Sequence, residues 1–259
     1  MTVQLLPSDY DERIREAVRS FWRTRQSPGP GKQGGTRDAV IGGKTLDGFC
    51  ELVRVVAVHC GLPADAVHTR RGSGTLPGYY RATKTWDVLV IYRKRLVAAF
   101  EFKSQVGSFG NNFNNRTEEV IGSAADLWVA HRQGAFSANR LDGINPIGTV
   151  TADPRPPFLG WMMLLEDCPA SQAPVVVDAP HYPAFPEFQG ASYARRYQLL
   201  AERLVKEQLY GAAALMLSNS EAGAQRGDFS ERSVATSHRT LFAEFAARVA
   251  AAAVEGPAA

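Results

Sequence analysis

The stretch "TWDVLVIYRKRLVAAFEFKSQ", residues 85–105, constrains the fold more than any other part of the chain. It holds two apolar runs, Asp87–Tyr92 and Leu96–Lys103, joined by the short link "RKR". Runs of this length that are so closely joined predict two buried strands in an antiparallel hairpin. Asp87 begins the first run, and Glu101 and Lys103 interrupt the end of the second. Buried charges are costly unless they are paired or bind a metal, so this hairpin is a candidate site.

Alternation along the second strand predicts which side chains share a face. Glu101, Lys103 and Gln105 lie on one face, and Phe100 and Phe102 point into the core on the other. The polar face of the strand therefore carries a carboxylate, an ammonium and an amide in a row. Gln105 is expected either to orient water or phosphate or to pack without a chemical role.

Asp87 is expected to lie across from Glu101, because the two residues are about equally far from the "RKR" link. Two adjacent carboxylates repel unless a cation sits between them or one of them is protonated. Oxygen ligands without His or Cys nearby favour Mg²⁺. With Lys103 beside a metal-bound water, the pattern predicts metal-assisted hydrolysis of a phosphodiester. The open alternative is a structural ion pair at a sheet edge.

The segment "SQVGSFGNNFNNRTEE", residues 104–119, follows the hairpin and is rich in Asn. Asn pairs with adenine and Arg with guanine in the major groove of DNA. The segment therefore predicts a DNA-binding loop, with Thr117 capping a helix over residues 117–133. The alternative is a turn that uses Asn for its left-handed positions. The candidate DNA contacts here are Asn111, Asn112, Asn114, Asn115 and Arg116.

The rest of the chain alternates between helical and strand-like patterns, which favours a single α/β domain over residues 1–259. Residues 137–157 form a long loop by composition and are expected to be mobile or to contact a ligand. The predicted helices cover residues 8–25, from 38 or 45 to 59, 117–133, 192–210 and 233–254. The further predicted strands cover residues 67–70, 158–167 and 212–218.

The 259 residues carry a formal net charge of only +3, so the distribution of basic residues matters more than their sum. Arg81 and Lys84 precede the hairpin and suit phosphate contacts, although solvated loop positions would explain them equally well. The three cysteines lack metal or disulfide spacing. No apolar run approaches the roughly 20 residues that span a bilayer, and residues 1–25 lack a signal-peptide pattern. The expected location is the cytoplasm, without membrane association.

Four segments make the chain resemble a known family. They are "GGKTLDGF", "TLPGYYRATKTWDVLV", "EFKSQVGSFGNNFNNRTEE" and "FPEFQGASY", and the likeness covers roughly residues 15–220. The chain is similar to the XhoI-type type II restriction endonucleases, which belong to the PD-(D/E)xK nucleases. One departure is Trp86, which stands where the superfamily has its nominal Pro, a residue that is not a ligand.

The resemblance implies a restriction-endonuclease-like core, a mixed central sheet flanked by helices. It implies that Asp87 and Glu101 are metal ligands and that Lys103 is the catalytic lysine. It also implies Mg²⁺-dependent double-strand cleavage of double-stranded DNA at the palindrome CTCGAG, between the first C and T, leaving 5′-TCGA ends. A C2 homodimer would match the palindrome, and a companion methyltransferase would protect the same site without direct contact.

Two other functions share parts of this pattern. A structure- or damage-directed nuclease would share the Asp87, Glu101 and Lys103 set, and a non-catalytic regulator would bind DNA without cutting it. The intact acid and lysine set favours an enzyme over a regulator, and the Asn-rich segment favours sequence recognition. Asp47 or Glu51, in the second helix, is a further candidate to hold a second cation.

Overall fold

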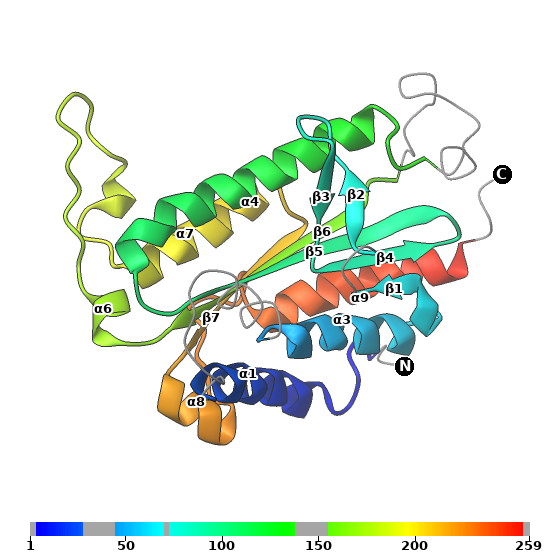
Figure 1. The fold of residues 1–259 in the computed structure, drawn as a ribbon, viewed down its shortest axis with the longest axis horizontal. Coiled ribbons are helices and arrows are strands. Elements are labelled where there is room, and N and C mark those ends of the chain that lie inside the picture. The colour runs from blue at the N-terminus through cyan, green and yellow to red at the C-terminus, as the bar shows by residue number, and fades with distance from the viewer. Residues whose placement is uncertain (1–3, 28–44, 70–72, 138–154, 256–259) are drawn as a thin grey trace.

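The computed structural model of the chain describes residues 4–27, 45–69, 73–137 and 155–255. Five strands form its central sheet: β1 Val67–His68, β4 Val88–Tyr92, β5 Arg95–Gln105, β6 Phe158–Glu166 and β7 Ala212–Ser218. They lie in the order β1-β4-β5-β6-β7 (Figure 1). β1, β4 and β5 pair antiparallel, whereas β5, β6 and β7 pair parallel. The sheet is mixed and flanked by helices, which confirms the predicted α/β fold class.

The predicted hairpin is confirmed as β4 and β5. Arg93 and Lys94 turn the chain with φ angles of 50° and 62°, in the left-handed region. Two successive residues of this kind match the twist of the flanking strands, which is why such turns dominate tight hairpins. The register shifts between Val90 and Ile91, so a bulge absorbs the extra residue of β5.

Helices cover both faces of the sheet (Figure 1). One face carries α9 (His238–Val254) and α3 (Asp47–His59), with α1 (Tyr10–Gln26) packed outside α3 and against α8 (Ser220–Arg226). The other face carries α4 (Phe109–Arg132) and α7 (Tyr193–Lys206), which lie side by side. Short helices complete the described chain: η1 Ala64–Ala66, α6 Pro169–Gln172 and η2 Pro186–Phe188. We call these the α9 face and the α4 face.

Each face has its own apolar core, and β5 contributes to both. On the α9 face Phe100 meets Phe245 edge-on at 4.9 Å, and Phe102 lies 6.1 Å from Phe49. On the α4 face Ala99 packs with Leu89 and Trp161. The prediction that Phe100 and Phe102 point into a core is confirmed, so from Ala99 onward the odd-numbered residues of β5 point towards α4.

Among the described residues, the edge strands of the sheet are short or already paired. β1 has only two residues, and β7 is covered by the chain that follows it. Leu217 exchanges hydrogen bonds with Ser230, at 2.9 and 2.7 Å, and the Leu215 amide donates to the Thr236 carbonyl at 3.0 Å. The outer edge of β7 is therefore already paired.

The predicted Asn-rich loop is wrong, because α4 begins at Phe109 and contains all four Asn residues of the segment. The turn comes earlier, at Gly107 and Ser108, with φ angles of 64° and 45°. Thr117 does not cap a helix; its hydroxyl donates to the carbonyl of Phe113 one turn back, at 2.9 Å. Packing of Phe109 and Phe113 against α7 outweighs the weak helix propensity of Asn.

Smaller differences concern the element boundaries. The closing helix begins at His238 instead of residue 233, and α8 was not predicted. The predicted loop before the hairpin contains a two-stranded ribbon, β2 Thr75–Pro77 paired with β3 Thr83–Thr85. The long loop over 137–157 falls mostly outside the described residues, and the single domain over 1–259 stays a prediction. No helix in the described ranges is long and apolar enough to cross a membrane.

Candidate active site

Asp87 and Glu101 come together at the free end of the β4–β5 hairpin. Val88 lies opposite Phe100, so the next pair in the register is Asp87 and Glu101. Asp87 Oδ2 accepts a hydrogen bond from the Phe102 amide at 2.7 Å, and the Asp87 amide donates to the Phe100 carbonyl at 3.1 Å. These bonds fix the Asp87 carboxylate beside β5.

Glu101 is held by two ammonium groups. Its side chain is 5% exposed, and Oε1 receives Lys103 Nζ at 2.8 Å and Lys84 Nζ at 3.2 Å. Burial alone would raise the pKa of Glu101, but the charges of Lys103 and Lys84 outweigh it and hold the pKa below its usual range. Glu101 is therefore ionised at neutral pH even though it is buried.

Asp87 behaves in the opposite way. Burial raises its pKa, and the Phe102 amide and Lys103 offset only part of that effect. The ionised form of Asp87 is therefore disfavoured unless a cation binds beside it. A carboxylate in this state gains free energy when a cation binds beside it.

The donor set fits a hard divalent cation. Glu101 Oε2 is buried and has no hydrogen-bond partner among the described residues, although such atoms normally have one. No group of three or more His, Cys, Asp or Glu side chains in the described ranges is placed to hold a metal. Two carboxylate oxygens completed by waters and substrate phosphate are the ligands that Mg²⁺ commonly uses.

Lys103 stands between the sheet and α4. Its Nζ lies 3.8 Å from Oε2 of Glu119, which also accepts from Arg116 at 2.6 Å. Burial would lower the pKa of Lys103, but the charge of Glu101, with smaller contributions from Asp87 and Glu119, raises it. Lys103 is therefore a positive charge at neutral pH. Glu119 was not singled out from the sequence; its spacing of three from Arg116 was the available signal.

The chain matches a model of the "Restriction endonuclease XhoI" family over residues 25–231. It is 45% identical over 201 residues to the type II restriction enzyme BstVI of Geobacillus stearothermophilus, covering 75% of this chain and 83% of that protein. It is 45% identical over 204 residues to the type II restriction enzyme XhoI of Xanthomonas vasicola, covering 76% of each chain. The type II restriction enzyme AbrI of Azospirillum brasilense is 47% identical over 183 residues, covering 68% of this chain and 75% of that enzyme. The chain belongs to the XhoI family of restriction endonucleases. It is therefore an enzyme that cleaves DNA. No solved structure gives a significant match to the chain.

Two basic residues predicted to contact DNA form ion pairs with buried carboxylates of the endonuclease. Lys84 joins the carboxylate cluster through Glu101, and its ammonium lies 4.6 Å from the centre of the Trp86 ring. Arg81 donates through Nε to Asp126 Oδ2 at 2.9 Å. Lys84 therefore serves as the second ammonium of the site.

The Asn residues of the endonuclease lie on the first turns of α4. Asn111, Asn114 and Asn115 are exposed, and their spacing of three and four places them on one side of the helix. Asn112 is half-buried and donates to the Ser108 carbonyl at 3.1 Å. Arg116 is half-buried and bound to Glu119. DNA contact by these residues stays a prediction, now for a helix face.

The remaining candidate residues are Gln105 on β5 and the two acids of α3. Gln105 is 4% exposed, and its amide donates to the carbonyl of Gly107 in the turn that precedes α4. Glu51 is ion-paired with Arg54 on the outer side of α3. Asp47 is exposed at the first position of α3. A role for Asp47 or Glu51 in holding a second cation stays a prediction.

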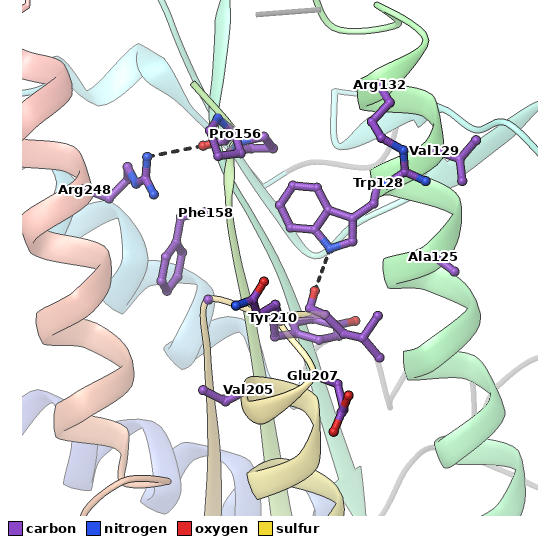
Figure 2. Close-up of a pocket in the computed structure, with 14 residues that line it drawn as sticks. Ala125, Trp128, Val129, Arg132, Pro156, Phe158, Val205, Glu207, Tyr210 and Arg248 are labelled. Atoms are coloured by element: carbon purple, nitrogen blue, oxygen red, sulfur yellow. Dashed lines mark hydrogen bonds between the residues drawn. The ribbon is translucent and has the colours of Figure 1, made fainter. Parts of the chain in front are cut away.

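A cavity of about 730 Å³ lies apart from these residues (Figure 2). It opens between α4, α9 and the link before β7, and Trp128, Arg132 and Arg248 line it. Phe158 in its wall pairs with Ala98, three residues from Glu101 along β5. The residues of the carboxylate cluster are not among those that line this cavity.

Proposed function

We propose that this restriction endonuclease is a type II enzyme that cuts both strands of double-stranded DNA at the palindrome CTCGAG. Cleavage falls between the first C and T, leaves 5′-TCGA ends and depends on Mg²⁺. The observation that carries the proposal is the pairing of Asp87 and Glu101 across the hairpin with Lys103 on Glu101. The names of the three relatives support the type II class.

The residues of the site divide the work of hydrolysis. Asp87 and Glu101 hold Mg²⁺, which supplies positive charge to the scissile phosphate. Lys103, whose ammonium lies 2.8 Å from Glu101, orients the attacking water and offsets negative charge on the phosphate. The water loses a proton to solvent as it adds to phosphorus, the bond between phosphorus and the 3′-oxygen breaks, and the 3′-oxygen takes up a proton to become a hydroxyl. The 5′-phosphate stays on the product.

The proposal extends to partners. The palindrome calls for a C2 homodimer with one active site for each strand. A DNA methyltransferase that acts on the same sequence protects the DNA of the cell without direct contact. The enzyme works in the cytoplasm, where that DNA lies.

The test is plasmid cleavage by the full chain with Mg²⁺ or with EDTA. We expect discrete fragments whose sequenced ends all begin with 5′-TCGA, and no cutting in EDTA or on a plasmid without CTCGAG. The matched control is Glu101→Gln purified in the same way, which excludes a contaminating nuclease. Smeared products, nicks confined to junctions, or uncut DNA would refute the proposed specificity.

A further inference from the structure

Asp126 is a buried carboxylate in the middle of α4 that the cleavage reaction does not use. It is 2% exposed. Ionised carboxylates are rarely buried without dedicated partners, because desolvation costs more than packing returns. Its position on a helix that otherwise packs apolar residues against the sheet calls for a specific reason.

The turn of the β2–β3 ribbon, residues Gly78–Ala82, explains why Asp126 is buried. We call this turn the tip. Asp126 Oδ1 accepts from the amides of Tyr79 and Tyr80 at 2.7 and 2.8 Å, and Oδ2 accepts from Arg81 Nε at 2.9 Å. A Cβ atom on Gly78 would lie 2.5 Å from Asp126 Oδ2, so only glycine fits there. One carboxylate thus fixes three consecutive residues of an exposed turn to α4.

The tip presents two tyrosines to solvent. Tyr79 is 54% exposed and Tyr80 is 71% exposed, with ring centres 5.0 Å apart and the rings edge to face. Folding does not explain this, because large aromatic side chains stabilise a protein when they are buried. A rigid turn that displays aromatic side chains is suited to contact a partner.

The tip is joined directly to the active site. β3 leads from the tip to Lys84, whose ammonium lies 3.2 Å from Glu101, and the ribbon rises from the sheet beside α4 (Figure 1). The four residues from Tyr80 to Lys84 leave the turn and enter β3, so their backbone spans at most about 13 Å. At about 3.4 Å for each nucleotide along a strand, that length corresponds to at most about four base pairs of duplex.

The ribbon carries no acidic side chain that would repel a polyanion. Residues 73–86 contain Arg81 and Lys84, which pair with the buried carboxylates of Asp126 and Glu101, and no acidic residue. Tyr hydroxyls are ordinary donors to phosphate oxygens, and such contacts position a duplex without reading its sequence.

We propose that Tyr79 and Tyr80 contact the sugar–phosphate backbone of the substrate duplex within about four base pairs of the cut, and that Asp126 is the positioning residue that holds them there. This inference rests on the proposed DNA substrate. The contacts are independent of base sequence, so they add affinity to every duplex that is long enough to reach the tip.

The test measures the dissociation constant of a 30-base-pair duplex carrying CTCGAG, with Ca²⁺ in place of Mg²⁺. We expect the double variant Tyr79→Ala/Tyr80→Ala to bind about tenfold more weakly, both to this duplex and to one without the site. On a short duplex that ends two base pairs outside each cut, so that CTCGAG stays intact, the variant and the parent should bind equally. The matched control is Tyr182→Ala, which removes a tyrosine that is 84% exposed outside the ribbon and should leave binding unchanged.

The variant Asp126→Ala tests the positioning role of Asp126 separately from the contact that the two tyrosines make. It leaves both tyrosines in place and should weaken binding to the long duplex by a similar factor, without changing affinity for the short one. Full affinity in the double tyrosine variant, or an equal loss in Tyr182→Ala, would overturn the inference while the enzyme still cuts. A parent chain that neither binds nor cuts duplex DNA would instead overturn the proposed function, and this inference with it.

Discussion

The two faces of the sheet differ in how their buried polar atoms are satisfied. On the α9 face the core of β5 is aromatic, with Phe100 and Phe102 among the rings of α3 and α9. The α4 face buries the charged groups Glu101 and Asp126. It also holds buried atoms without hydrogen-bond partners in the described part of the chain, among them Glu101 Oε2, Trp161 Nε1 and Tyr197 Oη.

Because of this difference, neighbouring residues of β5 have different roles: one stabilises a core and the next belongs to the candidate site. Phe100 and Glu101 are neighbours on β5, yet one packs against α9 and the other faces Lys103 and Lys84. Apolar packing rewards burial, whereas an unpartnered buried carboxylate oxygen costs free energy that only a bound ligand returns. The α9 face therefore supports the α4 face, which carries the proposed active site.

The largest effect is expected for Asp87→Asn. We expect cleavage to fall at least about 10³-fold, because a ligand of the cation and its charge are lost. Burial raises the pKa of Asp87, so the folded state disfavours the ionised form and stability at neutral pH should stay equal or rise. Single-turnover cleavage in Mg²⁺ and urea unfolding measure the two quantities. A variant that cuts as fast as the parent would remove Asp87 from the site.

Phe100→Ala should show the reverse behaviour. Removing a fully buried ring that contacts Phe158, Phe242 and Phe245 should cost about 3–5 kcal/mol of unfolding free energy. Cleavage for each folded molecule should remain within a few-fold of the parent at low temperature. A large loss of cleavage in a fully folded variant would show that the two faces are coupled.

A titratable group on the α9 face gives the next largest effect. Burial lowers the pKa of His238 to about 4, with a smaller contribution from Arg239. The unfolded chain binds this proton near pH 6.5 and the folded chain does not, so stability is lost as the pH falls from 6.5 to 4. The gap corresponds to at most about 3 kcal/mol.

The variant His238→Asn tests this dependence. It keeps an acceptor for the Tyr10 hydroxyl, which lies 2.8 Å from His238 Nδ1, and it does not titrate. Urea unfolding at pH 7 and pH 4.5 should show a smaller difference in the variant than in the parent. Equal pH dependence in both proteins would contradict a neutral His238 in the folded state.

Helix caps should give the smallest effect, and one that is alike on the two faces. Ser192 Oγ accepts from the Arg195 amide at 3.2 Å at the start of α7, and Ser237 Oγ accepts from the Thr240 amide at 3.0 Å at the start of α9. Each Ser→Ala variant should lose about 1 kcal/mol in thermal or urea unfolding. Cleavage below the unfolding transition should be unchanged in both, and a selective loss of cleavage in Ser192→Ala would tie α7 to the reaction.

Local patterns were sufficient to predict the hairpin and its acids. Alternation and a short link fix the register to within one residue, so Asp87 and Glu101 could be placed together before any coordinates. The same reasoning placed Phe100 and Phe102 in a core. Each of these features depends on residues close together in the sequence.

The remaining features depend on contacts that the sequence does not display. Whether the Asn-rich segment is a loop or a helix is decided by Phe113, whose ring packs 5.0 Å from Tyr197 on α7. Arg81 meets Asp126, which lies 45 positions away, and the side chain of Lys84 turns inward to Glu101. Local propensity carries no information about such partners.

The paired outer edge of β7 and the two-residue β1 have a consequence for assembly. A sheet with free backbone at its margin can recruit another chain by strand addition, which is a common route to aggregation. Among the described residues the two edge strands have little to offer, so a second copy that bound there would have to use side chains on helices and turns. Such an interface can be tuned by single substitutions without disturbing the strands that carry the acids.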